Sequence, residues 1–164
     1  MLTAVLIAGC TKRDENILFN IPYQVEFEIP AGLNTLETHV FEIFNIPTRI
    51  DTLLANFNID PNDLQSINPK ESQMEVTLNG LDYSFIREMS VQLFDKDDPD
   101  VDVEIFFHPQ VPFNTGSRLP LIPSLSNAQD FLLKESINLR VEFQLREFSP
   151  QFIPTRLNFV LKAL

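Results

Sequence analysis

The chain has 164 residues, of which 44% are hydrophobic and 21% charged, a composition typical of a globular domain rather than a disordered or fibrous chain. A domain of this size buries roughly 68–70% of its unfolded surface, enough for a core without disulfide bonds. With 23 acidic and 12 basic residues, the net charge of −11 argues against nucleic acid or an anionic lipid surface as the main partner. The single cysteine cannot form an intramolecular disulfide or a zinc site alone.

An apolar segment leads directly to this cysteine. Residues 1–9 carry no charge, and residues 6–10 read Leu-Ile-Ala-Gly-Cys. The segment is shorter than the roughly 20 apolar residues of a transmembrane helix, but it fits the about 7–15 of a signal-peptide core. Residues 6–10 resemble the lipobox of bacterial lipoproteins, which implies cleavage after Gly9 and a diacylglycerol thioether on Cys10. The alternative is an apolar N-terminus with an incidental cysteine.

A polar segment, Thr-Lys-Arg-Asp-Glu-Asn, follows at residues 11–16. It is typical of a lipoprotein tether, and its acidic pair resembles the surface-export signal of Bacteroidota lipoproteins; a solvated linker is the alternative. We predict a cleaved signal peptide at 1–9, a lipidated cysteine and tether at 10–16, and a single domain at 17–164. The expected location is the bacterial outer membrane, with the protein lipid-anchored and either surface-exposed or facing the periplasm.

From residue 17 onward, apolar and polar residues alternate, which is typical of strands with one face in water. The predicted strands are 17–21, 23–29, 39–46, 73–78, 86–94, 101–108, 137–146 and 156–162. We expect the last two to form a hairpin through a loop centred on residues 149–151.

Helical signals are short. Residues 48–56 fit about two turns, Asp60 with Pro61 fits a helix start, and Ser126 with Gln129 fits a capping box. Many amphipathic strands, few helices and 12 prolines predict a mainly β fold. We expect an antiparallel β-sandwich of seven or eight strands, immunoglobulin-like or jelly-roll-like, with two or three short helices.

The sequence offers no catalytic motif. The two histidines, His39 and His108, lie in predicted strands without metal-ligand spacing, and we expect both to form structural hydrogen bonds. A nucleophile elbow, a phosphate-binding glycine loop and a zinc-protease motif are all absent from the sequence. Carboxylate pairs meet only in space, so the sequence selects none. We therefore expect a protein that is not an enzyme and has no organic cofactor.

Residues 95–104 hold six acids in ten positions. Crowded carboxylates repel one another, and Ca²⁺ accepts such oxygens in irregular loops, with Asp95, Asp97, Asp98 and Asp100 as its ligands. The spacing is not that of an EF-hand, since Pro99 would occupy a ligand position. The alternative is an acidic turn that keeps the sheet edge soluble.

Charge and apolar residues suggest two partner-binding features. Residues 105–164 hold 4 acids and 6 bases, and outward-facing side chains would form a basic stripe on the last hairpin: Arg140, Arg146, Arg156 and Lys162. This stripe is either a solvated face paired with neighbouring acids or a docking face. Two apolar loops, residues 108–123 with Phe113 and residues 148–154 with Phe148 and Phe152, either cap the sandwich or contact a partner.

Glycan-binding surfaces rely on exposed Trp and Tyr, but this chain has no Trp, 2 Tyr and 15 Phe. We therefore expect a lipid-anchored envelope lipoprotein that acts as a non-catalytic binding or accessory subunit of a membrane protein complex. Its partners are the membrane, through the lipid on Cys10, and an envelope protein. A glycan-binding surface lipoprotein is the alternative.

Overall fold

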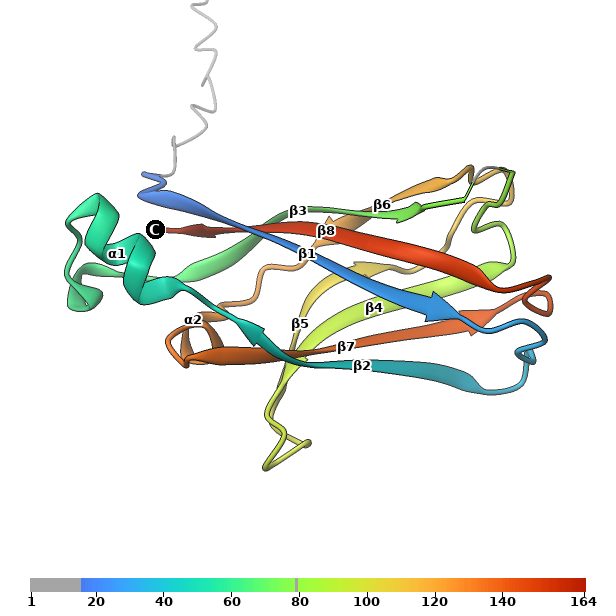
Figure 1. Ribbon diagram of the computed structural model, residues 1–164, viewed down its shortest axis with the longest axis horizontal. Helices are drawn as coiled ribbons and strands as arrows, with labels where there is room; N and C mark the ends of the chain where they lie inside the picture. Colours follow the sequence, from blue (N-terminus) through green and yellow to red (C-terminus); the bar gives the residue numbers. More distant parts are fainter. Residues whose placement is uncertain (1–15, 79) are drawn as a thin grey trace, which may run out of the picture.

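The computed structural model describes residues 16–78 and 80–164 (Figure 1). The predicted signal peptide, Cys10 and residues 11–15 of the tether lie outside the described residues. In chain order the elements are β1 (Phe19–Ile29), β2 (Thr38–Pro47), α1 (Ile50–Phe57), the 3-10 helix η1 (Pro61–Asp63), β3 (Ile67–Val76), β4 (Ile86–Phe94), β5 (Asp102–His108), β6 (Arg118–Pro123), α2 (Gln129–Leu132), β7 (Ser136–Leu145) and β8 (Ile153–Ala163).

The strands are hydrogen-bonded in the order β1-β8-β3-β6-β5-β4-β7-β2, and all neighbours are antiparallel. The sheet folds over between β6 and β5, which are paired only through Phe106 with Pro123 and Phe107 with Ile122. Two layers result, β1-β8-β3-β6 and β5-β4-β7-β2 (Figure 1). This order is that of a jelly roll. The predicted mainly β sandwich is confirmed, and the jelly roll is the topology adopted.

The largest differences from the predicted strands concern β1, β3 and β6. β1 continues through Pro22 and joins the two predicted strands at 17–21 and 23–29; an edge strand tolerates proline because one side of its backbone needs no ladder partner. β3 begins at Ile67, six residues earlier than predicted. β6, at residues 118–123, lies within the segment interpreted as a loop on account of its prolines, yet Leu119 and Leu121 alternate inward.

The predicted hairpin of the last two strands is wrong. β7 lies between β4 and β2 in one layer, whereas β8 lies between β1 and β3 in the other. The connection at residues 146–152 therefore crosses from one layer to the other. Alternation showed that both strands have one buried face, but it could not show which strand each one pairs with.

The helices close one end of the sandwich. α1 buries Ile50 and Leu54, and Asp60 accepts a hydrogen bond from the backbone N–H of Asn62 (2.8 Å) where η1 begins, as predicted. The capping box at Ser126 is wrong, because the Ser126 hydroxyl donates to the Glu104 carbonyl (2.8 Å) instead. Within the described residues, no helix is both long and apolar enough to cross a membrane.

Inward-facing side chains of both layers form one hydrophobic core. Seven of the 15 phenylalanines are buried, and the core includes stacked Tyr23 and Phe159, whose ring centroids lie 4.9 Å apart. Phe27 of β1 contacts Phe41 of β2 (5.7 Å), so aromatic side chains close the side of the sandwich where the two edge strands meet. Five other phenylalanines are exposed, so the phenylalanine excess serves more than the core.

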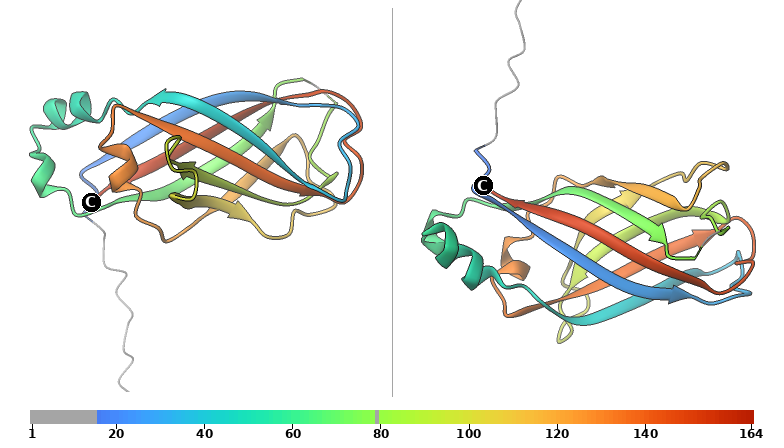
Figure 2. Two further views of the ribbon diagram at one scale, coloured as in Figure 1. Left: turned by 90° about the horizontal axis from the view of Figure 1, so that it is seen from below. Right: turned by 45° about the horizontal axis from the view of Figure 1, so that its top comes forward.

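The two ends of the sandwich differ. At the helix end lie α1, α2 and both ends of the described chain, and the N–H of Leu18 donates to the carbonyl of Ala163 (2.9 Å) (Figure 2). At the opposite end, here called the loop end, four connections meet: residues 30–37, 77–85, 109–117 and 146–152. The antiparallel order of the strands requires this separation, because every second connection returns to the same end.

Candidate functional site

A buried serine joins two of the connections at the loop end. The hydroxyl of Ser149 donates to the carbonyl of Pro30 (2.7 Å) and accepts from the N–H of Leu33 (2.8 Å). The Ser149 carbonyl also accepts from the N–H of Gly32 (2.9 Å). Ser149 therefore fixes the β1–β2 connection against the β7–β8 connection.

Hydrogen bonds also link the connections at residues 77–85 and 109–117 to the β7–β8 connection. The N–H of Arg146 donates to the carbonyl of Phe85 (2.9 Å), and the N–H of Val111 donates to the carbonyl of Arg87 (2.8 Å). The Arg146 guanidinium donates to the carbonyl of Val111. All four connections are thus linked, which predicts a surface of fixed shape.

The two apolar loops predicted from the sequence both cap the sandwich and expose apolar groups. Val111 and Ile153 are buried, whereas Phe113 is 77% exposed, Phe148 64% and Phe152 49%. Leu36 and Leu78, on the remaining two connections, are exposed as well. Large apolar side chains from all four connections therefore reach solvent at the loop end.

Arg146 lies at the centre of these linked connections. Its guanidinium lies over the ring of Phe113, 4.0 Å from the centroid, and its Nε and Nη1 are buried without a hydrogen-bond partner among the described residues. Phe113 stands in a turn in which the N–H (3.3 Å) and hydroxyl (2.7 Å) of Thr115 both donate to the carbonyl of Pro112. The loop thus brings an aromatic ring onto a cation for which residues 16–78 and 80–164 provide no carboxylate partner.

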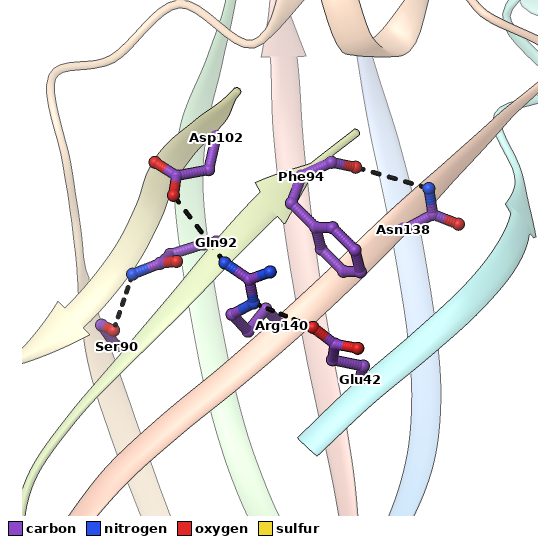
Figure 3. Close-up of polar contacts among 7 residues, drawn as sticks. All are labelled: Glu42, Ser90, Gln92, Phe94, Asp102, Asn138 and Arg140. Carbon is purple, nitrogen blue, oxygen red and sulfur yellow. Dashed lines mark hydrogen bonds and ion pairs between the residues drawn. The ribbon is translucent and has the colours of Figure 1, made fainter. Parts of the chain in front are cut away.

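Arg140 has a different environment on the outer face of β7. Its Nε donates to Glu42 (3.1 Å), its Nη1 lies 3.8 Å from the carboxylate of Asp102, and its guanidinium lies 4.5 Å from the ring centroid of Phe94 (Figure 3). These partners come from three neighbouring strands. Arg140 is therefore part of an ion-pair network of the sheet.

The basic stripe predicted on the last hairpin is not one surface. Because β7 and β8 lie in different layers, Arg140 is separated from Arg156 and Lys162. Arg156 donates to Glu26 of β1 (3.0 Å), and Lys162 occupies the same face of β8 and is also engaged in an interaction. For Arg140 and Arg156, the interpretation as a solvated face paired with acids on neighbouring strands fits the structure.

The acidic loop after β4 is held by a lysine. Asp95 accepts from Lys134 (2.7 Å) and from the N–H of Asp97 (3.0 Å), and the Lys134 hydrogen bond lowers the pKa of Asp95. Asp97, Asp98 and Asp100 are exposed. In residues 16–78 and 80–164, no three His, Cys, Asp or Glu side chains are placed to hold a metal ion, and calcium binding by this loop stays a prediction.

The histidines have unlike roles. His39 forms the predicted structural hydrogen bond, with its Nε2 2.8 Å from the carbonyl of Asn34. His108 does not, because its Nδ1 is buried without a partner among the described residues, and burial lowers its pKa. His108 lines a hollow of about 290 Å³ together with Glu88 and Glu104, and burial raises the pKa of Glu104. Glu104 and His108 share β5, but Glu88 comes from β4, so no signal in the sequence indicated that these three residues line one hollow.

The outer face of the other layer holds a hollow of about 750 Å³. Gln24, Asn158 and Gln73 occupy paired positions on β1, β8 and β3, so three amides form a row across this face. The next row consists of charged residues: Glu26, Arg156, Glu75 and Arg118. Only the strand register places these residues in rows, so sequence reasoning missed both.

The fold thus places the chain among the jelly rolls. Among solved structures it is similar to the decameric BFDV capsid protein, with 14% identity over 89% of this chain and 98% of that chain and a TM-score of 0.36. It is also similar to Desmodium yellow mottle tymovirus, with 11% identity over 98% of this chain and 94% of that chain and a TM-score of 0.30. Neither similarity supports an inference about function. No family model and no curated protein matches the chain.

Proposed function

We propose that the protein is a lipid-anchored envelope lipoprotein that acts as a non-catalytic binding or accessory subunit and docks on an envelope protein through its loop end. The observation that carries this proposal is the group of exposed large apolar side chains on connections fixed to one another: Leu36, Leu78, Phe113, Phe148 and Phe152. Apolar patches on rigid loops favour protein partners, because little conformational freedom is lost on binding.

The position of the tether supports the use of this end. The described chain begins at Asn16, at the helix end, so a lipid on Cys10 attaches the molecule there (Figure 1). A tether of residues 11–16 reaches at most roughly 20 Å when fully extended. The helix end also exposes apolar side chains, Ile17, Phe57, Leu125 and Leu133, but these lie on the side of the membrane attachment. The loop end points away from it.

Partner capture tests the docking half of the proposal. A Phe113→Ser/Phe148→Ser double variant and the wild type are purified by affinity from gently solubilised membranes, and partners are quantified by mass spectrometry. We expect at least a tenfold loss of one stoichiometric partner in the variant. Leu125→Ser/Leu133→Ser, at the helix end, is the matched control and should retain the partner. Equal loss in both variants would contradict docking through the loop end.

Membrane fractionation tests the anchoring half. Cys10→Ser removes the thiol that carries the lipid, so we expect the variant to leave the membrane fraction. A hydrophobic anchor contributes about 0.8 kcal/mol per buried CH₂, and the acidic domain offers no replacement attraction to an anionic bilayer. Recovery of Cys10→Ser in the membrane at the wild-type level would show that Cys10 is not the anchor.

The amide row favours a second candidate, a glycan-binding lipoprotein. Gln24, Asn158 and Gln73 present both donors and acceptors across a hollow large enough for a sugar, and neutral amides suit an uncharged ligand. Binding on a glycan array that is lost in Asn158→Ala, together with recovery of no stoichiometric protein partner, would favour this function over docking.

A further inference from the structure

We propose that Arg146 and Phe113 form a carboxylate-binding subsite within the loop end, which takes an acidic group carried next to an apolar group on the partner. The inference rests on the proposed docking function and names the chemistry that the docking surface recognises. It starts from the two guanidinium nitrogens of Arg146 that are buried without a partner among the described residues.

The other arginines of the sheet faces show what Arg146 lacks. Arg140 has Glu42 and Asp102, Arg156 has Glu26, and Arg118 lies 3.6 Å from Glu75. A guanidinium is ionised at every physiological pH, and burying its donors without acceptors is unfavourable. In place of a carboxylate, Arg146 has one backbone carbonyl and the face of a ring.

The described part of the chain supplies no acid to this position. Glu147, the acid next to Arg146 in the sequence, is exposed, and within residues 16–78 and 80–164 no ion pair is formed by Arg146. Charge complementarity therefore favours an external carboxylate, which accepts charge-assisted hydrogen bonds from a guanidinium.

Phe113 covers the guanidinium but can uncover it. Its side chain is 77% exposed and stands at the tip of the turn at residues 112–115, so rotation about χ1 needs no backbone movement. Exposed side chains change rotamer within picoseconds to nanoseconds. An incoming carboxylate replaces the ring at the guanidinium, and Phe113 becomes free to pack against the apolar group beside that carboxylate.

Two matched probes test the subsite. N-acetyl-phenylalanine carries an aromatic ring next to a carboxylate, and its primary amide has the same shape without the charge. Each is titrated into the full chain carrying Cys10→Ser, and binding is followed by the ¹⁵N–¹H resonance of Arg146 Nε. We expect the acid to bind at least ten times more tightly than the amide. Equal affinity for acid and amide, or equal shifts at the Nε of Arg156, would overturn the proposal.

Variants distinguish binding at the subsite from nonspecific binding. Arg146→Gln should remove the preference for the acid, whereas Arg156→Gln should keep it. Arg146→Lys retains the positive charge and replaces Arg146→Gln in this test if that variant does not fold. It should reduce the preference for the acid over the amide at least threefold. Phe113→Ala removes a ring that both covers the guanidinium and packs against the apolar group of the bound probe, so it should change the affinities for acid and amide alike and keep the preference for the acid. Loss of that preference in Phe113→Ala would overturn the assignment of the carboxylate to Arg146.

The results also distinguish this subsite from the docking function. If the acid binds at Arg146 while the Phe113→Ser/Phe148→Ser variant keeps all its partners, the subsite stands and docking through the loop end fails. If that variant loses its partner while acid and amide bind Arg146 equally, docking stands and the subsite fails.

Discussion

The core of the sandwich is covered at both ends, but by different kinds of structure. The helix end is closed by apolar side chains of two helices: Ile50, Leu54, Phe131 and Leu132. The described residues of the loop end form no helix, and this end is closed by buried side chains that include Val111 and Ile153. A helix satisfies its backbone groups internally, but a loop must find partners elsewhere. The loops therefore bond to one another, and this linkage leaves a stiff surface with aromatic side chains facing outward.

Each end also has a buried hydroxyl that joins separate segments. At the helix end, Thr48 is buried and donates to the carbonyl of Lys134 (2.6 Å). At the loop end, the Ser149 hydroxyl makes two hydrogen bonds with residues of another connection. The comparison indicates that stability is built into both ends, whereas the contact between an exposed aromatic ring and a guanidinium that forms no ion pair among the described residues, Phe113 with Arg146, belongs to the loop end.

Truncation of core side chains should have the largest effect on the free energy of unfolding, and this effect should be equal at both ends. Ile153→Ala at the loop end and Leu132→Ala at the helix end should each lower the free energy of unfolding by about 2–5 kcal/mol, because each removes a fully buried side chain. Their sequence neighbours, Phe152 and Leu133, are exposed, so Phe152→Ala and Leu133→Ala should change the free energy of unfolding by less than about 0.5 kcal/mol. Urea denaturation gives all four values. A Phe152→Ala loss as large as that of Ile153→Ala would show that the exposed rings serve stability.

Removing the hydroxyls should have intermediate effects. Ser149→Ala and Thr48→Val should each lower the free energy of unfolding by about 1–3 kcal/mol, because backbone groups lose their buried partners. Only Ser149→Ala should speed amide hydrogen exchange at Gly32 and Leu33. If Thr48→Val accelerates exchange there equally, the two ends are not independent.

Acidification should lower the stability of the fold through groups at both ends, in a different pH range for each end. These effects should be the smallest of those predicted. Burial lowers the pKa of His108, close to the loop end, below 6.5, so the unfolded chain takes up the proton first and stability falls as pH drops below 6.5. At the helix end, the Lys134 hydrogen bond keeps the pKa of Asp95 below 3.8, so its contribution is present above 3.8 and is lost only below that value. NMR titration of both side chains measures the pKa values. In Lys134→Met, the pKa of Asp95 should rise towards 3.8 while that of His108 stays unchanged.

Periodicity predicted much of the fold and little of the site. Alternation identified nearly every strand, including residues 86–94 at their observed bounds, because burial of one face constrains every second residue. It missed β6, whose prolines indicate a loop, and it mispaired β7 with β8, because alternation contains no information about partners. Phe113, Phe148 and Arg146 were selected from the sequence, but the contact between Phe113 and Arg146 depends on how two distant connections meet.

The position of β1 has a mechanical consequence. β1 is the first strand after the proposed tether and is an edge strand, paired with β8 from Phe19 opposite Ala163 to Ile29 opposite Ile153. If the molecule is held by its tether and pulled by a partner at the loop end, the force acts along this strand. Hydrogen bonds loaded in shear resist together, whereas bonds pulled across a strand break one after another. The same first strand that begins the fold would therefore let the anchored domain stay folded under tension.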